Sequence, residues 1–366
     1  MVPDDHKLHG ESRKEKENNM KKKLMAVVLT AAMALSMVAC GSSNSGDTEK
    51  SSKSDSSFKV GLVLDVGGVN DGSFNQTSWE GLEKAKKDFG IEGSYLESDT
   101  DADYASNIET FIDDDCDLII CVGYMLADAL KEAAEENPDQ KFAILDDASI
   151  DMDNVACLMF EQEQASYLVG YVAGLMTKTN NVGFVLGMSN ETMNQFGYGY
   201  YAGAIDANPD VKVQGMNANS FADAATGKAD ANSMITNGAD IIFHAAGATG
   251  LGVIEACQEA GVYAIGVDTD QASIAPETII TSAMKKVDSA VYDTVEKTMK
   301  DEFVSGITTY DLSSSGVDIS PTQDLLPDDV VAKIEEVKKQ IIDGDITVPK
   351  TQKDFEAKYG DVYDLD

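Results

Sequence analysis

The chain has 366 residues and carries 64 acidic against 28 basic side chains, which gives a net charge of −36 at pH 7. The residues after position 40 hold 59 of the acidic and 21 of the basic side chains. A surface this acidic repels nucleic acid and anionic lipid head groups, so we exclude nucleic acid as a partner. Only one histidine, His244, follows position 40, which argues against a Ser-His-Asp triad and a histidine-rich zinc site. We therefore expect neither a metal nor a cofactor.

Residues 20–40 have the pattern of a secretory signal peptide. Three lysines follow Met20, an apolar stretch runs from Leu24 to Val38, and small residues lead to Cys40. This stretch is too short to span a bilayer comfortably, since a membrane helix needs ~20 apolar residues. A glycine and serines follow Cys40, as in bacterial lipoproteins, whose cysteine is acylated and becomes the mature amino terminus. We predict a lipid such as palmitate on Cys40; ordinary cleavage, with an incidental Cys40, is the alternative.

The segments around the signal peptide are not expected to fold. Residues 1–19 are charged and lack apolar periodicity, which indicates an upstream extension before a start at Met20. Residues 41–57 are rich in serine and poor in apolar side chains, so they predict a flexible tether. A tether behind a lipid anchor would hold the folded body on the extracytoplasmic face of the cell membrane. That body begins near Phe58 and is long enough for two domains.

Four cysteines lie in the body of the chain. Cys121 and Cys157 occupy apolar, strand-like runs, and Cys257 occupies a helical run. Together with Cys116 they form no dense or regular disulfide framework. We expect small buried residues rather than disulfides.

Apolar, often β-branched runs alternate with amphipathic helical stretches through the body. This alternation predicts an α/β fold with parallel sheets that are buried on both faces. Ser73 and Gln76 match a capping box, so the first helix is expected to begin at Phe74. The expected strands cover residues 59–66, 116–123, 141–146, 155–160, 182–187, 211–216, 239–247 and 262–268.

The ends of these strands point to a ligand site. In open parallel sheets, ligands bind beyond the carboxyl ends of the strands. The residues that follow the expected strands are therefore candidate ligand contacts, and they are residues 65–75, 123–124, 146–147, 244–252 and 268–271, together with Phe221.

Several segments in order resemble the basic membrane lipoproteins, a family that includes purine nucleoside-binding lipoproteins of ABC transport systems. VNDGSFNQTSWEGL (69–82) is similar to the family's Asp-x-Ser-Phe-Asn-Gln segment. The segments DLIICVG, NPDQKFAILD, NVACLMFEQEQASYLVGYVAG, IIFHAAGATGLGV, IGVDTDQ and TSAMKKVD follow in the family's order. The resemblance covers about residues 58–288. Asn70 stands where an acid is frequent, and the chain lacks the basicity in the family's name.

The resemblance implies a two-lobed, type I periplasmic-binding fold, in which each lobe is a parallel sheet flanked by helices and the chain crosses between lobes three times. The first lobe would comprise residues 58–160 and about 279–303, and the second 161–278 and about 304–366. The implied function is not enzymatic. The chain would capture a small molecule, a purine nucleoside, in the cleft and deliver it to the permease and ATPase subunits of an ABC importer.

The resemblance also implies which residues would contact the purine base. Phe74 and Phe221 would stack on its two faces, and Phe196, expected to follow a strand, is a third candidate. Each of these rings could instead belong to the core.

Polar residues would complete the implied site. Asn75 and Asp146 would hydrogen-bond the base edge, with Asp147 as the alternative to Asp146. Asp71 is a further candidate contact, or else a group at the start of a helix.

Three residues would hold the ribose. Asp268 would accept hydrogen bonds from its hydroxyl groups. Lys285, or its neighbour Lys286, would hold a ribose oxygen or Asp268 itself. Gly247 would allow the backbone to approach the sugar.

Two segments imitate sites that we do not expect. GATGLG (247–252) lacks the Gly-Lys-Ser/Thr of a P-loop and the Rossmann spacing. Asp99, Asp101 and Asp103 imitate the start of a calcium loop, but Tyr104 replaces the required glycine and Thr110 the bidentate glutamate.

Other function classes stay open on the sequence alone. A nucleoside hydrolase would need clustered carboxylates, for which Asp268 and Asp270 are the best pair. A chemoreceptor-type sensor or an adhesin would share the binding lobes, and sugars and autoinducers are also bound by this architecture.

Overall fold

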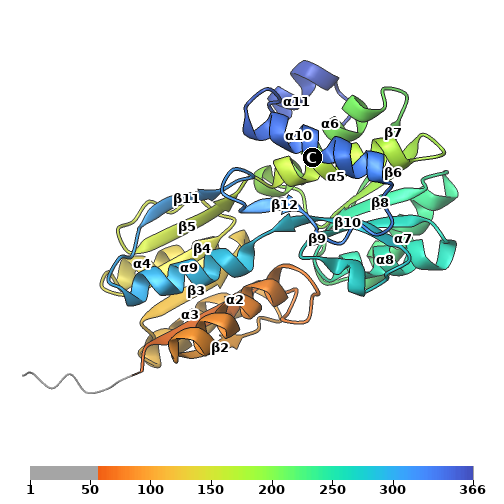
Figure 1. Ribbon diagram of the computed structural model, residues 1–366. Helices are drawn as coiled ribbons and strands as arrows, with labels where there is room; N and C mark the ends of the chain where they lie inside the picture. Colours follow the sequence, from red (N-terminus) through yellow and green to blue (C-terminus); the bar gives the residue numbers. More distant parts are fainter. Residues whose placement is uncertain (1–56, 366) are drawn as a thin grey trace, which may run out of the picture. The chain divides into compact units, whose positions relative to one another are not determined.

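The computed structural model describes residues 57–365, which form two lobes, each built on a six-stranded sheet (Figure 1). In the first sheet the strand order is β11-β5-β4-β3-β1-β2, and all neighbouring strands are parallel. The bounds are β1 Lys59–Leu64, β2 Glu92–Leu96, β3 Leu118–Val122, β4 Lys141–Leu145, β5 Val155–Phe160 and β11 Gly306–Tyr310.

Helices cover both faces of the first sheet. In β1, Val60, Leu62 and Leu64 pack into one core, and Val63 packs into another, so both faces of the strand are buried. The first core includes residues of α2 (Phe74–Phe89) and α9 (Val287–Met299), which lie side by side in Figure 1. The second includes residues of α3 (Tyr104–Asp113) and α4 (Ala127–Glu136). The expected parallel sheet buried on both faces is confirmed.

The second sheet repeats this plan with one exception. Its order is β12-β10-β9-β8-β6-β7, parallel throughout except that β12 runs antiparallel to β10. The sequence between the strands again forms helices that bury both faces. The strand bounds are β6 Asn181–Leu186, β7 Lys212–Asn217, β8 Ile241–Ala245, β9 Tyr263–Asp268, β10 Ile279–Lys285 and β12 Val317–Ile319. The helices are α5 Gln162–Met176, α6 Glu191–Ala207, α7 Ala224–Thr236, α8 Thr249–Ala260, α10 Asp328–Ile342 and α11 Gln352–Tyr359.

The chain passes between the two sheets three times: from β5 to α5, from β10 to α9, and from β11 to β12. The later passages differ from the expected lobe boundaries. Residues 279–285 pair with β9 and β12 and so belong to the second sheet, whereas residues 306–310 pair with β5 in the first. The first lobe is therefore residues 57–160 and 286–310, and the second is residues 161–285 and 311–365.

Helix α2 begins at Phe74, as predicted, but the expected capping box is wrong. The Ser73 side chain does not cap the helix. Instead the Asp71 carboxylate accepts hydrogen bonds from the backbone N–H groups of Ser73 (2.9 Å), Asn75 (2.9 Å) and Gln76 (3.1 Å). One carboxylate thus satisfies three donors that have no partner inside the helix.

All four cysteines within the described residues are buried and free, as expected. Helix α5, which contains the apolar run at 167–176, is largely buried between neighbouring elements. Across residues 57–365 we find no helix with the length and apolar character to cross a membrane. The predicted signal peptide, Cys40 and nearly all of the tether lie outside the described residues.

Candidate functional site

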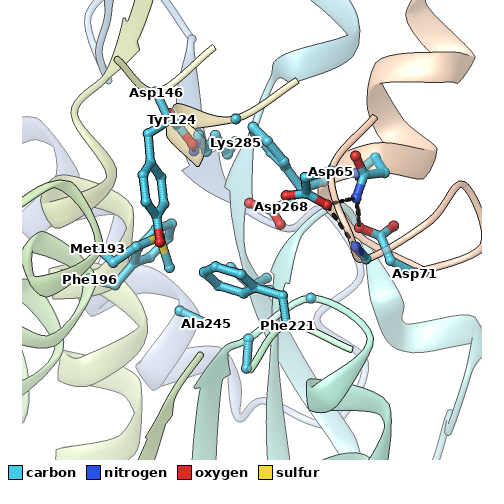
Figure 2. Close-up of a pocket in the computed structure, with 17 residues that line it drawn as sticks. Asp65, Asp71, Tyr124, Asp146, Met193, Phe196, Phe221, Ala245, Asp268 and Lys285 are labelled. Atoms are coloured by element: carbon cyan, nitrogen blue, oxygen red, sulfur yellow. Dashed lines mark hydrogen bonds and ion pairs between the residues drawn. The ribbon is translucent and has the colours of Figure 1, made fainter. Parts of the chain in front are cut away.

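A pocket lies between the carboxyl ends of the strands of the two lobes (Figure 2). The pocket and the open solvent at its mouth together hold about 510 Å³ of space free of protein atoms. The nine residues that the family resemblance implied as first-choice ligand contacts all line this pocket. The complete lining is Asp65, Gly67, Asp71, Phe74, Asn75, Gly123, Tyr124, Asp146, Met193, Phe196, Phe221, Ala245, Ala246, Gly247, Val267, Asp268 and Lys285.

Aromatic rings enter the pocket from both lobes. Phe74 is the first residue of α2 in the first lobe, and Phe221 lies in the loop between β7 and α7 in the second. Gly187 makes room for the Phe221 ring, because a Cβ atom there would lie 2.3 Å from Phe221 Cε1. Phe196, expected after a strand, lies within helix α6, which follows β6, and reaches the pocket from there.

An ion pair joins the two lobes at one end of the pocket. Lys285 Nζ, at the end of β10, contacts Asp146 Oδ2, which follows β4, and both side chains are buried. The Lys285 ammonium also lies 4.7 Å from the centre of the Phe74 ring and 5.6 Å from that of Phe196. Cations are attracted to the faces of aromatic rings, so the rings and the carboxylate together hold this ammonium in place.

The structure also separates the two pairs of neighbours that the sequence left open. Asp147 does not line the pocket, and its carboxylate accepts hydrogen bonds from Ser149 N (2.8 Å) and Oγ (2.6 Å). Lys286 precedes α9 as its N-terminal cap residue and does not line the pocket either. Asp146 and Lys285 are therefore the members of each pair that face the cavity.

Asp268 is the last residue of β9 and makes a second link between the lobes. The Ser73 hydroxyl, from the first lobe, donates a hydrogen bond to Asp268 Oδ2. Burial raises the pKa of Asp268 above its ordinary value, although the nearby Lys285 and the Ser73 hydrogen bond lower it. Asp268 (φ 62°) and Asp146 (φ 64°) both have left-handed backbone, which aspartate tolerates better than most residues.

A network of two carboxyl groups and an amide forms one wall of the pocket. Asn75 Nδ2 donates to Asp65 Oδ1 (2.7 Å) and to Asp71 Oδ2 (3.2 Å), and Asn75 Oδ1 has no partner among the described residues. Burial raises the pKa of Asp65, and it raises that of Asp71 to about 7 despite three backbone hydrogen bonds. In Figure 2 these acids lie on the side opposite Tyr124 and Phe196. We call the side with Asp65 and Asp71 the acidic wall and the side with Tyr124 and Phe196 the aromatic wall; Asp146 lies beside Tyr124.

Sequence reasoning missed two residues of the pocket. Val267 is the penultimate residue of β9, inside a strand, where no loop signal marks it. Met193 lies in the first turns of α6, shortly after β6. The rule that ligands bind beyond strand ends, extended past residue 187, would have included Met193.

One of the segments that imitate other sites, the one with Asp99, Asp101 and Asp103, has a structural use. Asp103 accepts a hydrogen bond from the backbone N–H of Thr100 (2.9 Å) and so closes a short turn. No three His, Cys, Asp or Glu side chains gather as a metal site would need anywhere in residues 57–365.

Comparison with known proteins accounts for this arrangement. The family model described as "ABC transporter substrate-binding protein PnrA-like" matches residues 58–352. The chain belongs to this family. Its members are substrate-binding proteins of ABC transporters and not enzymes, so the expected family, the two-lobed fold and the absence of an enzymatic role are confirmed.

Individual relatives agree with the family match. The chain is 41% identical to the "CD4+ T-cell-stimulating antigen" of Listeria innocua, over 90% of this chain and 99% of that protein. It is 34% identical to the "ABC transporter nucleoside-binding protein BmpA" of Lactococcus lactis, over the same shares. A solved solute-binding protein of an ABC transporter from Aeropyrum pernix superposes with a TM-score of 0.76 at 26% identity, covering 83% of this chain and 98% of its own. An ABC substrate-binding protein works with permease subunits and a small ligand.

Proposed function

We propose that this chain binds a purine nucleoside between its lobes and delivers it to an ABC permease, while a lipid on Cys40 and the Ser-rich tether hold it at the extracytoplasmic face of the membrane. The Lactococcus lactis relative, whose name records nucleoside binding, supports the ligand class. The signal-peptide pattern that ends at Cys40 supports the location.

The observation that carries the ligand class is the presence of aromatic rings from both lobes in one pocket. Phe74 enters from the first lobe and Phe221 from the second, and a flat base between them would contact both. Stacking on an aromatic side chain contributes about 1–3 kcal/mol per base and suits any planar heterocycle. A ligand bound in this way joins the lobes through contacts that an open arrangement lacks.

Unpartnered acceptors in the pocket favour a ligand rich in N–H and O–H groups. Asn75 Oδ1 and Asp146 Oδ1 are buried and have no hydrogen-bond partner within the described residues. A buried acceptor without a donor costs free energy, so a ligand that supplies a donor at each position gains affinity. The imino and amino groups of a purine and the hydroxyl groups of a ribose are such donors.

The charges of the pocket argue against a phosphorylated ligand. Four of the described residues that line it carry carboxyl groups, Asp65, Asp71, Asp146 and Asp268, and Lys285 is the one basic residue among them. Lys285 is already paired with Asp146. A phosphate dianion would meet an excess of negative charge at low dielectric, whereas a neutral nucleoside would not.

Calorimetric titration tests this proposal. We expect guanosine, adenosine or inosine to bind, and the corresponding 5′-monophosphate to bind at least tenfold more weakly. Phe74→Ala should weaken nucleoside binding roughly five- to 150-fold through the loss of one stacking ring. Phe89→Ala, at the other end of α2 and outside the pocket, is the matched control and should bind as the wild type does. Binding of a monosaccharide in place of every nucleoside would refute the assignment.

A further inference from the structure

A buried glutamine connects the two lobes without lining the pocket. Gln271 begins a short 3₁₀ turn (Gln271–Ser273) after β9, and its side chain is 1% exposed. Its Nε2 donates to the backbone carbonyl of Gly72 in the first lobe at 2.8 Å. Gly72 lies in the loop before α2 and, like Gln271, is not among the residues that line the pocket.

The second lobe fixes which way the Gln271 amide faces. The backbone N–H of Val267 lies 3.0 Å from Gln271 Oε1, and a backbone N–H can only donate, so the atom facing it must be the oxygen. His244 Nε2 lies 3.1 Å from the same oxygen and must therefore carry the ring proton. With both donors on Oε1, the NH₂ group is directed to Gly72.

His244 is held in this role by its surroundings. The ring is fully buried, and burial lowers its pKa to about 4, so it is neutral near pH 7. Gly250 lies against its other nitrogen, since a Cβ atom at Gly250 would be 2.0 Å from His244 Nδ1. The ring is thus held in one position and one tautomer, with its proton on Nε2, and this N–H donates to Gln271 Oε1.

We propose that Gln271, oriented by His244 and Val267, is a latch that favours the closed arrangement of the lobes by donating to Gly72. It is a positioning residue, because it touches neither the pocket nor its contents. Two other side-chain links between the lobes, Ser73 with Asp268 and Lys285 with Asp146, use the pocket-lining groups Asp268, Lys285 and Asp146, which a ligand would contact. The Gln271–Gly72 bond, in contrast, uses no group that lines the pocket.

A latch of this kind acts on all ligands alike. A hydrogen bond between the lobes exists only while the lobes are together, so it raises the fraction of molecules in the closed state. The apparent affinity of every ligand that binds the closed state rises in proportion to that fraction. Residues that contact the ligand behave differently, because their replacement changes the affinity of one ligand relative to another.

The test uses the full-length protein with two substitutions at position 271. Gln271→Glu, studied at pH 8, keeps an oxygen for Val267 and His244 and places a second oxygen against the Gly72 carbonyl. Gln271→Asn is neutral, and its side chain is one methylene shorter, so its amide is moved away from the Gly72 carbonyl. This variant replaces Gln271→Glu in the test if Gln271→Glu does not fold. Gln258→Glu, exposed on α8 of the same lobe, controls for the added charge.

We expect the affinities for guanosine, adenosine and inosine to fall by one common factor, about 3- to 10-fold, as loss of one hydrogen bond predicts. Small-angle scattering of the ligand-free variants should give a larger radius of gyration than that of the wild type, with an unchanged value for Gln258→Glu. Unchanged affinities and radius in both variants, or a changed ranking of the three nucleosides, would overturn the latch. The inference rests on the proposed function only because the affinity measurements use nucleosides as probes. If the wild type binds no nucleoside, the proposed ligand class is wrong, and the scattering comparison alone tests whether Gln271 favours the closed arrangement.

Discussion

At the scale of single residues, the site depends on carboxyl groups that burial makes unusually basic. Asp71 is the clearest case, since its carboxylate both caps α2 and orients the Asn75 amide. Burial is the largest influence on its pKa and outweighs the hydrogen bonds that favour the ionised form. When such a group is ionised it lowers the stability of the folded protein, because the folded state must then hold a charge that water would solvate better.

The pKa of Asp71 predicts how stability changes with pH. Its pKa rises from an ordinary value of 3.8 to about 7 in the folded protein, so the folded state binds more protons than the unfolded state in between. The contribution of Asp71 to stability is therefore fully present below pH 3.8 and is lost as the pH rises to about 7. The loss is at most ~4 kcal/mol, since one pKa unit corresponds to about 1.4 kcal/mol.

Chemical denaturation of the wild type and of Asp71→Asn at pH 5 and pH 8 measures this effect. We expect the loss of unfolding free energy between the two pH values to be smaller in Asp71→Asn, whatever that variant's absolute stability. Parallel profiles in the two proteins would show that the Asp71 carboxyl titrates normally.

At this scale the sequence was a good guide to which residues meet, and a poor guide to their partners. The position of Phe74, Asn75 and Asp268 in or near the segments that follow apolar runs was enough to place them in one pocket, because parallel strands end at a common edge. The sequence could not distinguish Asp146 from Asp147, since that depends on one left-handed backbone angle. Nor could it show that Ser73 donates to Asp268, 195 positions away, instead of capping its own helix.

At the scale of elements, two closely packed helices support the aromatic wall. Helix α6 carries Met193 and Phe196 and lies against α5 through glycines on both helices. A Cβ atom at Gly203 would lie 2.0 Å from the carbonyl oxygen of Tyr167, and one at Gly170 would lie 2.2 Å from that of Tyr200. Such distances leave no space for a side chain, so the separation of the helices depends on these glycines.

This packing predicts that replacing glycine with alanine, which stabilises most exposed helices, lowers the stability of this protein. In the interior of an exposed helix, alanine is more stabilising than glycine by about 1 kcal/mol. Gly203→Ala should instead destabilise the protein by about 1–3 kcal/mol, because the added methyl group forces α5 and α6 apart. The measurement is the unfolding free energy from urea titration. A variant as stable as the wild type, or more stable, would show that α5 and α6 accommodate the added methyl group without moving apart.

Three of the strands that the sequence analysis did not list are short or lie at the edge of a sheet. Strand β2 (EGSYL) is an edge strand with no fully buried residue, and β11 (GITTY) is an edge strand with exposed positions, including Ile307. Strand β12 has only three residues. Central strands such as β1 and β3 appear as continuous apolar runs because both of their faces are buried, and an edge strand gives no such signal. The shifted lobe boundaries follow from this, since β11 returns to the first sheet.

At the scale of the whole molecule, the proposed anchor determines where the protein works. Replacing Cys40 with alanine should release the protein into the soluble fraction, because we expect the lipid alone to hold it and residues 57–365 contain no helix that could span the membrane. The measurement is fractionation after a salt wash, with Cys116→Ala as the control that keeps the anchor. Cys40→Ala protein that still sediments with membranes would contradict the lipoprotein assignment.

The two lobes account for binding through a shared pocket. The first lobe supplies Phe74, Asn75 and Asp146, and the second supplies Phe221 and Asp268. Neither lobe alone holds the complete set, so under the proposed function capture of a ligand and closure of the lobes would be one process. A closed form joined by its ligand is what a permease could distinguish from the empty protein.

The most direct test of this account is to identify the ligand that the protein carries from the cell. Mass spectrometry of small molecules released by denaturing the purified protein should detect a purine nucleoside in molar proportion to the wild type, and much less with Phe74→Ala. A sugar or another non-purine compound in that proportion, with no purine nucleoside, would contradict the central claim.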